Sequence, residues 1–473
     1  MDTDTKQGRL EPRAGALFDE GELPMPARRI EGEPSTQSVP RLMSPVRNQV
    51  ELRACDLDAL LPTDHPARTV WAFVQSLDLA ALYASIKAVQ GAAGRPAIDP
   101  AILVALWLWA TLDGVGSARE VDRLCERDDA YRWLCGGVRV NYHTLADLRT
   151  EQAPWLDAQL TRSIGALLER KLVSLNVVAQ DGLRVRAAAK AASFRRRARL
   201  EQCMAQAQAQ VQALKGELQA DAAASSRRKQ AAGERAARER TERLAQALAT
   251  MQQIERTRPA KKKRPSDHED PPGGAAAAKA KPESEPRVST TDPEARVMKM
   301  ADGGFRPAFN AQLAVDAPTQ LIAAVHVLNL GSDMNEMVPM HAQIQQRYQR
   351  TPNHWLADGG FTKLQAIEQL AQQGTQALLP APKSRDPHID SLLPKSTDSE
   401  PLAQWRARMA SLAGQALYRQ RAASVECANA QLRRRGLYQF NVRGLRKARA
   451  VLLWHALAHN LMRMASLNIA FQG

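Results

Sequence analysis

Residues 172–182 read LVSLNVVAQDG, and this stretch decides the fold class of the chain. Leucine and valine fill five of its first seven positions, and Asp181 and Gly182 close it. A short continuous apolar run that is rich in β-branched residues and bounded by a turn dipeptide predicts a buried central strand. We therefore expect a sheet whose first strand ends at Asp181.

Further strand and helix patterns follow in the C-terminal half. FNAQLAVD (309–316) and LIAAVHVLNL (321–330) flank Pro318, which predicts a β-hairpin. A helix is expected over 333–350, a strand over 354–361, a helix over 363–374 and a strand over 375–382, followed by a long basic helix. This order predicts a mixed α/β sheet in a catalytic domain that covers residues 171–473.

The N-terminal part has a different character. Residues 1–48 mix Pro, Gly, Ser and charges without apolar periodicity, which is typical of a disordered tail. Residues 49–170 read as an all-helical domain, with helices expected over 66–79, 100–112, 117–126 and 144–168. Pro100 directly after Asp99 is a helix-opening pair.

An insertion interrupts the sheet pattern between residues 190 and 290. Two runs of apolar residues alternate spacings of three and four or repeat every seven, as on the facing sides of paired helices. We expect residues 190–256 to form an antiparallel, coiled-coil-like hairpin and residues 257–290, which contain KKKR, PP and GG, to be a flexible linker. The first run comprises Leu200, Met204, Ala207, Val211, Leu214 and Leu218, and the second comprises Ala237, Leu244, Ala247, Met251 and Ile254.

Composition narrows the class of partner. The 473 residues carry a net charge of +15, which favours a polyanion such as nucleic acid over a membrane surface. No apolar run approaches the length of a membrane span, and the five cysteines are scattered without a CxxC pair. We expect a cytoplasmic protein with reduced thiols.

Three carboxylates are candidates for chemistry. Asp181 and Asp358 each follow an expected strand and precede a glycine, a pattern that fits either a metal site or a simple turn. Glu426 is the one acid in the arginine-rich stretch 419–449, where it is either a solvated ion-pair partner or a residue with a specific role. Three such carboxylates suit two hard divalent cations acting at a phosphodiester, with nearby arginines holding the phosphates.

Other patterns admit two interpretations. His455 and His459 lie four residues apart, as metal ligands can, but the surrounding leucines favour a packed helix. The arginine run RRRAR at 195–199 is either a phosphate contact or a solvated charge run. Tyr142, His143 and Arg149 are weaker candidates for DNA contact.

The stretch YRQRAASVECANAQLRRRGL (418–437) resembles the tyrosine, arginine, glutamate and basic-residue signature of bacterial insertion-sequence DDE transposases. Tyr418, Arg421, Glu426 and Arg433 fall on its positions, with arginine where lysine is more usual. The resemblance extends over about residues 50–185 and 288–465, through the blocks GRPAIDPAILVALWLWATLDGVGSARE, DPEARVMKMADGGFRPAFNAQLAVD, LGSDMNE and ADGGF.

The resemblance implies an RNase H-like core in which Asp181, Asp358 and Glu426 bind two Mg²⁺ ions, with Mn²⁺ as a substitute. It also implies double-stranded DNA as the partner, at the element ends and at the target, and a homo-oligomer assembled on that DNA in the bacterial nucleoid. Tyr418, Arg421, Arg433, Arg434 and Arg435 are the expected DNA-binding residues. The sequence thus predicts a transposase that cleaves and transfers strands; the alternatives are an RNase H-like nuclease without strand transfer and a catalytically idle DNA-binding or assembly protein.

Overall fold

The computed structural model describes residues 56–88, 96–220, 224–257, 285–382, 388 and 390–470. The expected tail, residues 1–48, lies outside the described residues, as does most of the expected linker, residues 258–284.

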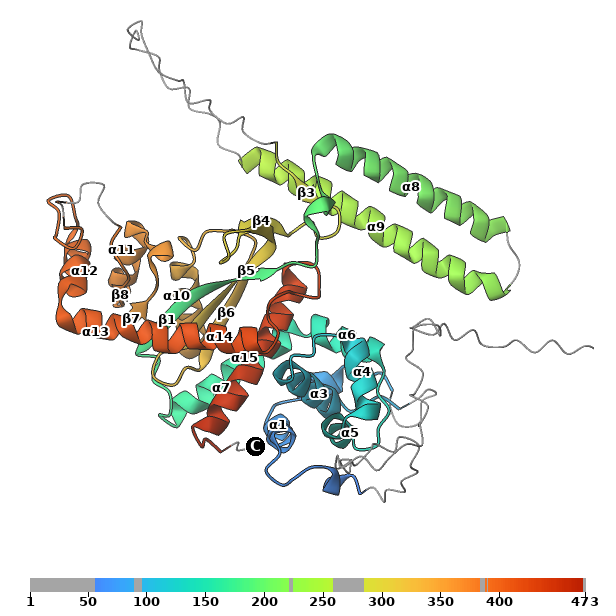
Figure 1. Cartoon of the computed structure of the whole chain (residues 1–473), viewed down its shortest axis with the longest axis horizontal. Coiled ribbons are helices and arrows are strands. Elements are labelled where there is room, and N and C mark those ends of the chain that lie inside the picture. Colours follow the sequence, from blue (N-terminus) through green and yellow to red (C-terminus); the bar gives the residue numbers. More distant parts are fainter. Residues whose placement is uncertain are drawn as a thin grey trace, which may run out of the picture. The chain divides into compact units, whose positions relative to one another are not determined.

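A mixed six-stranded sheet forms the centre of the C-terminal half (Figure 1). Strand β1 pairs antiparallel with β5 on one side and parallel with β7 on the other, and β8 continues the parallel part. The far edge of β5 pairs with β4 and with β6, both antiparallel. The strands are β1 (Val177–Arg186), β4 (Arg296–Lys299), β5 (Phe305–Asp316), β6 (Ile322–Leu328), β7 (His354–Leu356) and β8 (Gln376–Leu378).

Strand β1 does not end at Asp181, so the expected turn at this position is wrong. Asp181 pairs with Leu313 and Gly182 pairs with Gln312 in an unbroken antiparallel ladder that continues to Arg186. Beyond the Asp-Gly pair, Leu183 and Val185 are buried while Arg184 and Arg186 are not, which is the alternation of a strand. Pairing with the long strand β5 overrides the local turn preference.

The N-terminal region is helical. Its helices are α1 (Pro66–Gln75), α2 (Ala80–Ala84), α3 (Pro100–Leu112), α4 (Ala118–Arg127), α5 (Asp129–Cys135), α6 (Tyr142–Glu151) and α7 (Ala153–Glu169), preceded by the short turn η1 (Asp58–Leu60). The Asp99 side chain accepts a hydrogen bond from the Ala101 N–H and caps α3, as the sequence predicts. The single helix expected over 144–168 is wrong, because Pro154 has no N–H to continue the hydrogen bonds of α6 and instead stands in the first turn of α7.

Helices also surround the sheet in the C-terminal half. They are α10 (Met337–Tyr348), η3 (Gly359–Phe361), α11 (Leu364–Gln372), α12 (Glu400–Ala410), α13 (Leu412–Arg421), the π-helical turn η4 (Ala422–Glu426), α14 (Cys427–Arg434) and α15 (Leu445–Ser466).

Helix α15 connects the helical region to the sheet. Its Asn460 side chain donates to the Ile322 carbonyl and accepts from the Ile322 N–H, both at 2.8 Å, at the start of β6. Its Trp454 indole donates to the Arg149 carbonyl of α6 at 3.1 Å. His455 and His459 are buried on the same helix, as the packed-helix interpretation predicts.

The insertion forms two helices, α8 (Arg197–Ala220) and α9 (Ala224–Thr257), which lie side by side (Figure 1). They are framed by a two-stranded ladder of β2 (Phe194–Arg195) and β3 (Val288–Ser289), after the short turn η2 (Ala191–Ser193). Residues of both predicted apolar runs pack in one cluster, separate from the main core. Its buried members are Leu200, Ala207, Leu244, Ala247, Met251 and Val288.

No helix in the described part of the chain is long and apolar enough to cross a membrane.

This separation of cores predicts that the insertion is dispensable for folding of the rest. Arg195 pairs directly with Val288, so a short Gly/Ser turn can replace residues 196–287 without moving the strand ends. We expect the shortened protein to unfold cooperatively, with its midpoint in urea close to that of the full chain, because the main core keeps its contacts. Loss of the cooperative transition in circular dichroism would contradict this.

Candidate active site

The parallel pairing of β1 with β7 brings Asp181 and Asp358 together. Val177 pairs with His354 and Ala179 with Leu356, a register offset of 354 − 177 = 177 residues. The pairing ends at Ala179 and Leu356, two residues before Asp181 and Asp358, and the same offset, 358 − 181 = 177, separates the two aspartates. They are close enough for the Asp358 charge to help raise the pKa of Asp181. The two carboxylates are therefore close together in space, although the segment between them in the sequence includes the whole insertion.

Asp181 lies in a partly enclosed polar environment. Its carboxylate accepts hydrogen bonds from the Gly182 N–H at 2.9 Å and from the Asn429 amide at 2.7 Å. Burial raises its pKa to about 6, against the opposing charge of Arg421 at 3.9 Å, and the neighbouring Asp358 and Asp333 raise the pKa further. Sequence reasoning missed Asn429, although it lies one helical turn after Glu426 in the signature stretch.

Asp358 follows β7 and caps the short turn η3. Its side chain accepts a hydrogen bond from the Gly360 N–H at 2.8 Å and is partly exposed. The turn interpretation therefore describes the local geometry of Asp358. Because a carboxylate has two oxygens, the Asp358 side chain can cap this turn and still offer an oxygen to a ligand near Asp181.

Glu426 is placed by a π-helical turn. In an α-helix, residues five positions apart point about 140° away from each other, whereas a π turn closes hydrogen bonds between them. The turn η4 lets the Arg421 guanidinium donate to the Glu426 carboxylate at 2.5 Å. Arg421 therefore stands between Glu426 and Asp181 and is electrostatically coupled to both.

Side chains satisfy the carbonyls that the π turn frees. The Ser424 hydroxyl donates to the Gln420 carbonyl at 2.7 Å, and the Gln320 amide donates to the Ala423 carbonyl at 2.9 Å. The long helix expected around Glu426 is present from Leu412 to Arg434, with this π-helical turn inside it. Val425 is buried while Glu426 is exposed, so the two point in different directions.

Asp333 is a fourth acid near the site that sequence reasoning missed as a functional residue. Its carboxylate pairs with Arg184 at 2.8 Å and accepts from the Asn310 and Gln312 amides, each at 2.6 Å. It approaches β1 under Gly182, where an added Cβ would lie only 2.4 Å from its Oδ1. An added Cβ at Gly360 would lie 3.0 Å from Asp358 Oδ1 and 3.8 Å from Asp333 Oδ2, so the Asp333 carboxylate also approaches Asp358. The block LGSDMNE contains the one sequence signal for it.

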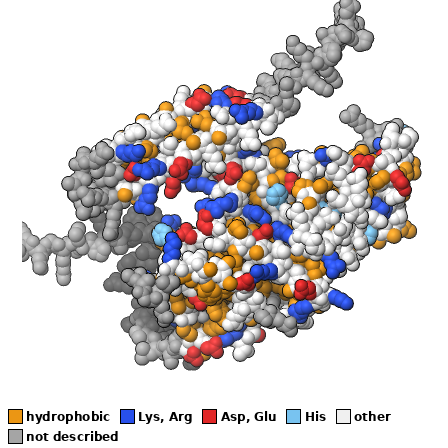
Figure 2. Space-filling view, turned by 180° about the vertical axis from the view of Figure 1, so that it is seen from behind, with side chains coloured by type: hydrophobic (Ala, Val, Ile, Leu, Met, Phe, Trp, Pro, Cys, Tyr) orange, Lys and Arg blue, Asp and Glu red, His pale blue; other side chains and the backbone are white. Residues whose placement is uncertain are grey.

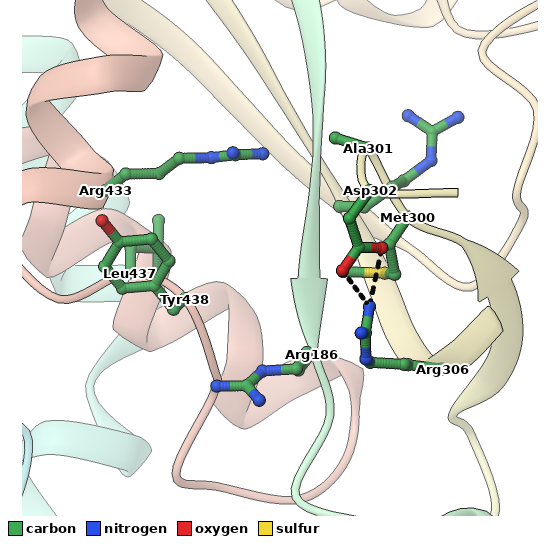
Figure 3. A pocket seen from close by; sticks show the side chains of 9 residues that line it. Arg186, Met300, Ala301, Asp302, Arg306, Arg433, Leu437 and Tyr438 are labelled. Atoms are coloured by element: carbon green, nitrogen blue, oxygen red, sulfur yellow. Dashed lines mark hydrogen bonds and ion pairs between the residues drawn. The ribbon is translucent and has the colours of Figure 1, made fainter. Parts of the chain in front are cut away.

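The three expected arginines after Glu426 have different surroundings. Arg433 lines an open hollow together with Arg186 and the exposed Tyr438, and Figure 3 shows its side chain extending across that hollow toward β1. Arg434 is exposed. Arg435 is partly buried and lies 3.5 Å from His459.

Tyr418 is half-buried and lies close to Arg421, the same guanidinium that contacts Glu426.

The carboxylates have the chemistry that a divalent cation needs, but their present arrangement does not form a complete site. Oxygen ligands from aspartates are what Mg²⁺ prefers, and a cation would offset the burial and the acidic neighbours that raise the pKa of Asp181. However, no three His, Cys, Asp or Glu side chains among the described residues are placed to hold one ion together. The ion pair of Glu426 with Arg421 accounts for the missing third ligand.

Two transposase families match the chain. Residues 281–461 match the family described as Transposase DDE domain, and residues 55–151 match the one described as Transposase domain (DUF772). Comparison with curated proteins and with solved structures finds no match. The DDE match contains Asp358 and Glu426, whereas Asp181 lies before it, on the other side of the inserted helices.

The mixed sheet and its surrounding helices form an RNase H-like core, preceded by a helical N-terminal region. Matches to two transposase domains, one over the helical N-terminal region and one over most of the C-terminal half, identify the chain as an insertion-sequence DDE transposase, a metal-dependent enzyme of DNA transposition.

Proposed function

We propose that this transposase binds the ends of its element, cleaves a DNA strand there and joins the new 3′ end to target DNA, with Asp181, Asp358 and Glu426 as the ligands of Mg²⁺. The observation that supports the proposal is the β1–β7 register, which ends two residues before both aspartates. Two bound divalent cations would activate the attacking oxygen and stabilise the leaving oxygen of an in-line displacement.

The protein groups have distinct tasks in this proposal. Asn429 and the Gly182 N–H orient the Asp181 carboxylate, leaving its outer lone pairs for a ligand. Arg421 neutralises Asp181 and Glu426 before the site is loaded and then turns to a DNA phosphate, which frees Glu426. Arg433 and Arg434 hold the phosphate backbone of the scissile strand.

Pairing of two element ends requires at least two copies of the protein, so we propose a homo-oligomer that assembles on DNA in the nucleoid. Purified protein should release a 3′ hydroxyl at a duplex carrying the inverted repeat that flanks the reading frame, and should join it to a plasmid. Cleavage without joining would favour the nuclease alternative, and DNA binding without either reaction would favour the idle binding protein.

The aspartates can be tested by removing their charge at constant size. Asp181→Asn and Asp358→Asn should each reduce strand cleavage by more than about 100-fold, because a neutral amide is a poor ligand for Mg²⁺. Binding to the same duplex should stay within a few-fold of wild type. Asp129→Asn, at an exposed ion pair in α5, is the matched control and should cleave normally. Near-normal cleavage by either active-site variant would assign that aspartate a turn role.

Glu426 can be tested against Asp333 as the third ligand. Glu426→Gln should bind duplex DNA as well as wild type in the absence of metal, because it removes a negative charge near the phosphates, yet it should lose cleavage in Mg²⁺. Glu400→Gln, at an exposed glutamate of α12, is the control. If Glu426→Gln cleaves within a few-fold of wild type while Asp333→Asn folds and does not cleave, the third ligand is Asp333.

Gly182 supplies a separate test of the strand geometry. Gly182→Ala places a methyl group against Asp333 and the Gln312 amide, which lies 2.6 Å from the added Cβ. We expect it to displace Asp333 from β1 and to lower the stability by about 1–3 kcal/mol, measured by urea unfolding. Unchanged stability would mean that Asp333 moves away from β1 at no cost.

A further inference from the structure

A second basic hollow lies away from the carboxylates, at the root of the inserted helices. Five arginines from segments far apart in the sequence line it: Arg195 of β2, Arg199 of α8, Arg240 and Arg243 of α9, and Arg443 just before α15. We propose that this hollow, hereafter the root groove, binds backbone phosphates of duplex DNA outside the cleavage site. The proposal rests on the proposed function, because it extends the DNA contact of the same enzyme.

The arginines of the root groove are available for a ligand. Arg195 and Arg443 are exposed and have no side-chain partner among the described residues. Arg199 and Arg240 contact neutral glutamine side chains, at 2.8 and 3.4 Å. Arg243 alone has an acid nearby, Glu239 at 3.6 Å, and that glutamate is mostly exposed. The local positive charge is therefore largely uncompensated.

Neighbouring arginines of the same run have a different arrangement. Arg196 pairs with Glu285 at 3.1 Å, and Arg197 pairs with Glu255 and with Glu201. The run at 195–199 thus divides into residues neutralised by acids and residues, Arg195 and Arg199, that face the root groove. If these arginines were only a solvated charge run with no ligand, there would be no reason for them to divide in this way.

The framework of the root groove is held in place on both sides. On the insertion side, the Ser193 and Ser289 hydroxyls hydrogen-bond at 2.7 Å across the β2–β3 ladder. On the other side, buried Asp292 accepts from the Gly444 N–H at 3.2 Å and Glu294 accepts from the Leu445 N–H at 2.9 Å, which fixes the backbone after Arg443. A framework that is already ordered loses less conformational entropy on binding.

The lining identifies the class of ligand. Small-molecule pockets are mostly apolar, whereas Leu244 and Cys203 are the main apolar contributions here, and no described residue that lines the groove is acidic. Guanidinium groups and the hydroxyls of Thr290 and Thr291 are donors that suit phosphate oxygens. On the face shown in Figure 2, Lys and Arg side chains gather across the middle with acidic side chains among them.

The test uses the full-length protein and a random-sequence duplex, because phosphate contacts do not depend on sequence. Each phosphate contact contributes about −0.9 to the slope of log affinity against log salt concentration. The triple variant Arg199→Ala, Arg240→Ala, Arg443→Ala should therefore reduce the magnitude of the slope by about 2 to 3. Fluorescence anisotropy titrations over a range of KCl concentrations measure it.

A matched triple variant controls for net charge. Arg123→Ala, Arg196→Ala, Arg238→Ala also removes three exposed arginines, each of which is paired with a glutamate outside the root groove. It should change the slope by less than one. Equal losses in the two triple variants, or no loss in the first, would overturn the proposal.

Cys203 provides a local readout, since its partly exposed thiol lines the groove. Saturating duplex should slow alkylation of Cys203 several-fold in wild type but not in the root-groove variant, as followed by mass spectrometry. An unchanged rate in wild type would place the DNA elsewhere.

The outcome separates this inference from the proposed function. If wild type cleaves the end duplex but the root-groove variant keeps the full salt slope, this inference alone fails. If wild type binds no DNA, both fail.

Discussion

The parallel pairing of β1 with β7 is the contact on which the proposed active site depends. It joins segments that are 177 residues apart and ends two residues before Asp181 and Asp358. Long-range pairing of this kind has a high entropic cost of loop closure, and the surrounding core must offset it. Buried Trp355 contributes at this point, since its indole donates to Gln180 of β1 at 3.0 Å. The insertion lengthens the connection but packs mainly on itself, so the strand pairing does not depend on it.

Arg421 links the electrostatics of the carboxylates to the shape of the backbone. The π turn η4 adds the rotation that brings Glu426 under the guanidinium of Arg421, and Ser424 and Gln320 satisfy the carbonyls that this turn leaves open. Burial of Asp181 and its two acidic neighbours raise the pKa of Asp181 and favour a cation beside it. In the described structure Arg421 is that cation, and its ion pair with Glu426 holds Glu426 apart from the aspartates.

Sequence patterns predicted the elements that depend on local chemistry. Asp99 caps the helix that begins at Pro100, and the residues of the two apolar runs meet in the inserted helices. Errors arose where neighbouring segments override local preference. Pro154 divides an expected helix, and pairing with β5 carries β1 through the Asp-Gly pair that reads as a turn.

The sequence by itself determined the class of fold, the carboxylates worth testing and the excess of arginine, because periodicity, caps and composition are local properties. Tertiary structure decided which acids are neighbours and which arginines are neutralised. Asp333 lies near the site because it packs against Gly182 and accepts hydrogen bonds from two amides of β5. In the arginine run at 195–199, the paired residues are those that meet glutamates up to about ninety residues away in the sequence. Ion pairs and strand register are long-range contacts, and short-range patterns in a single sequence do not encode which partners meet.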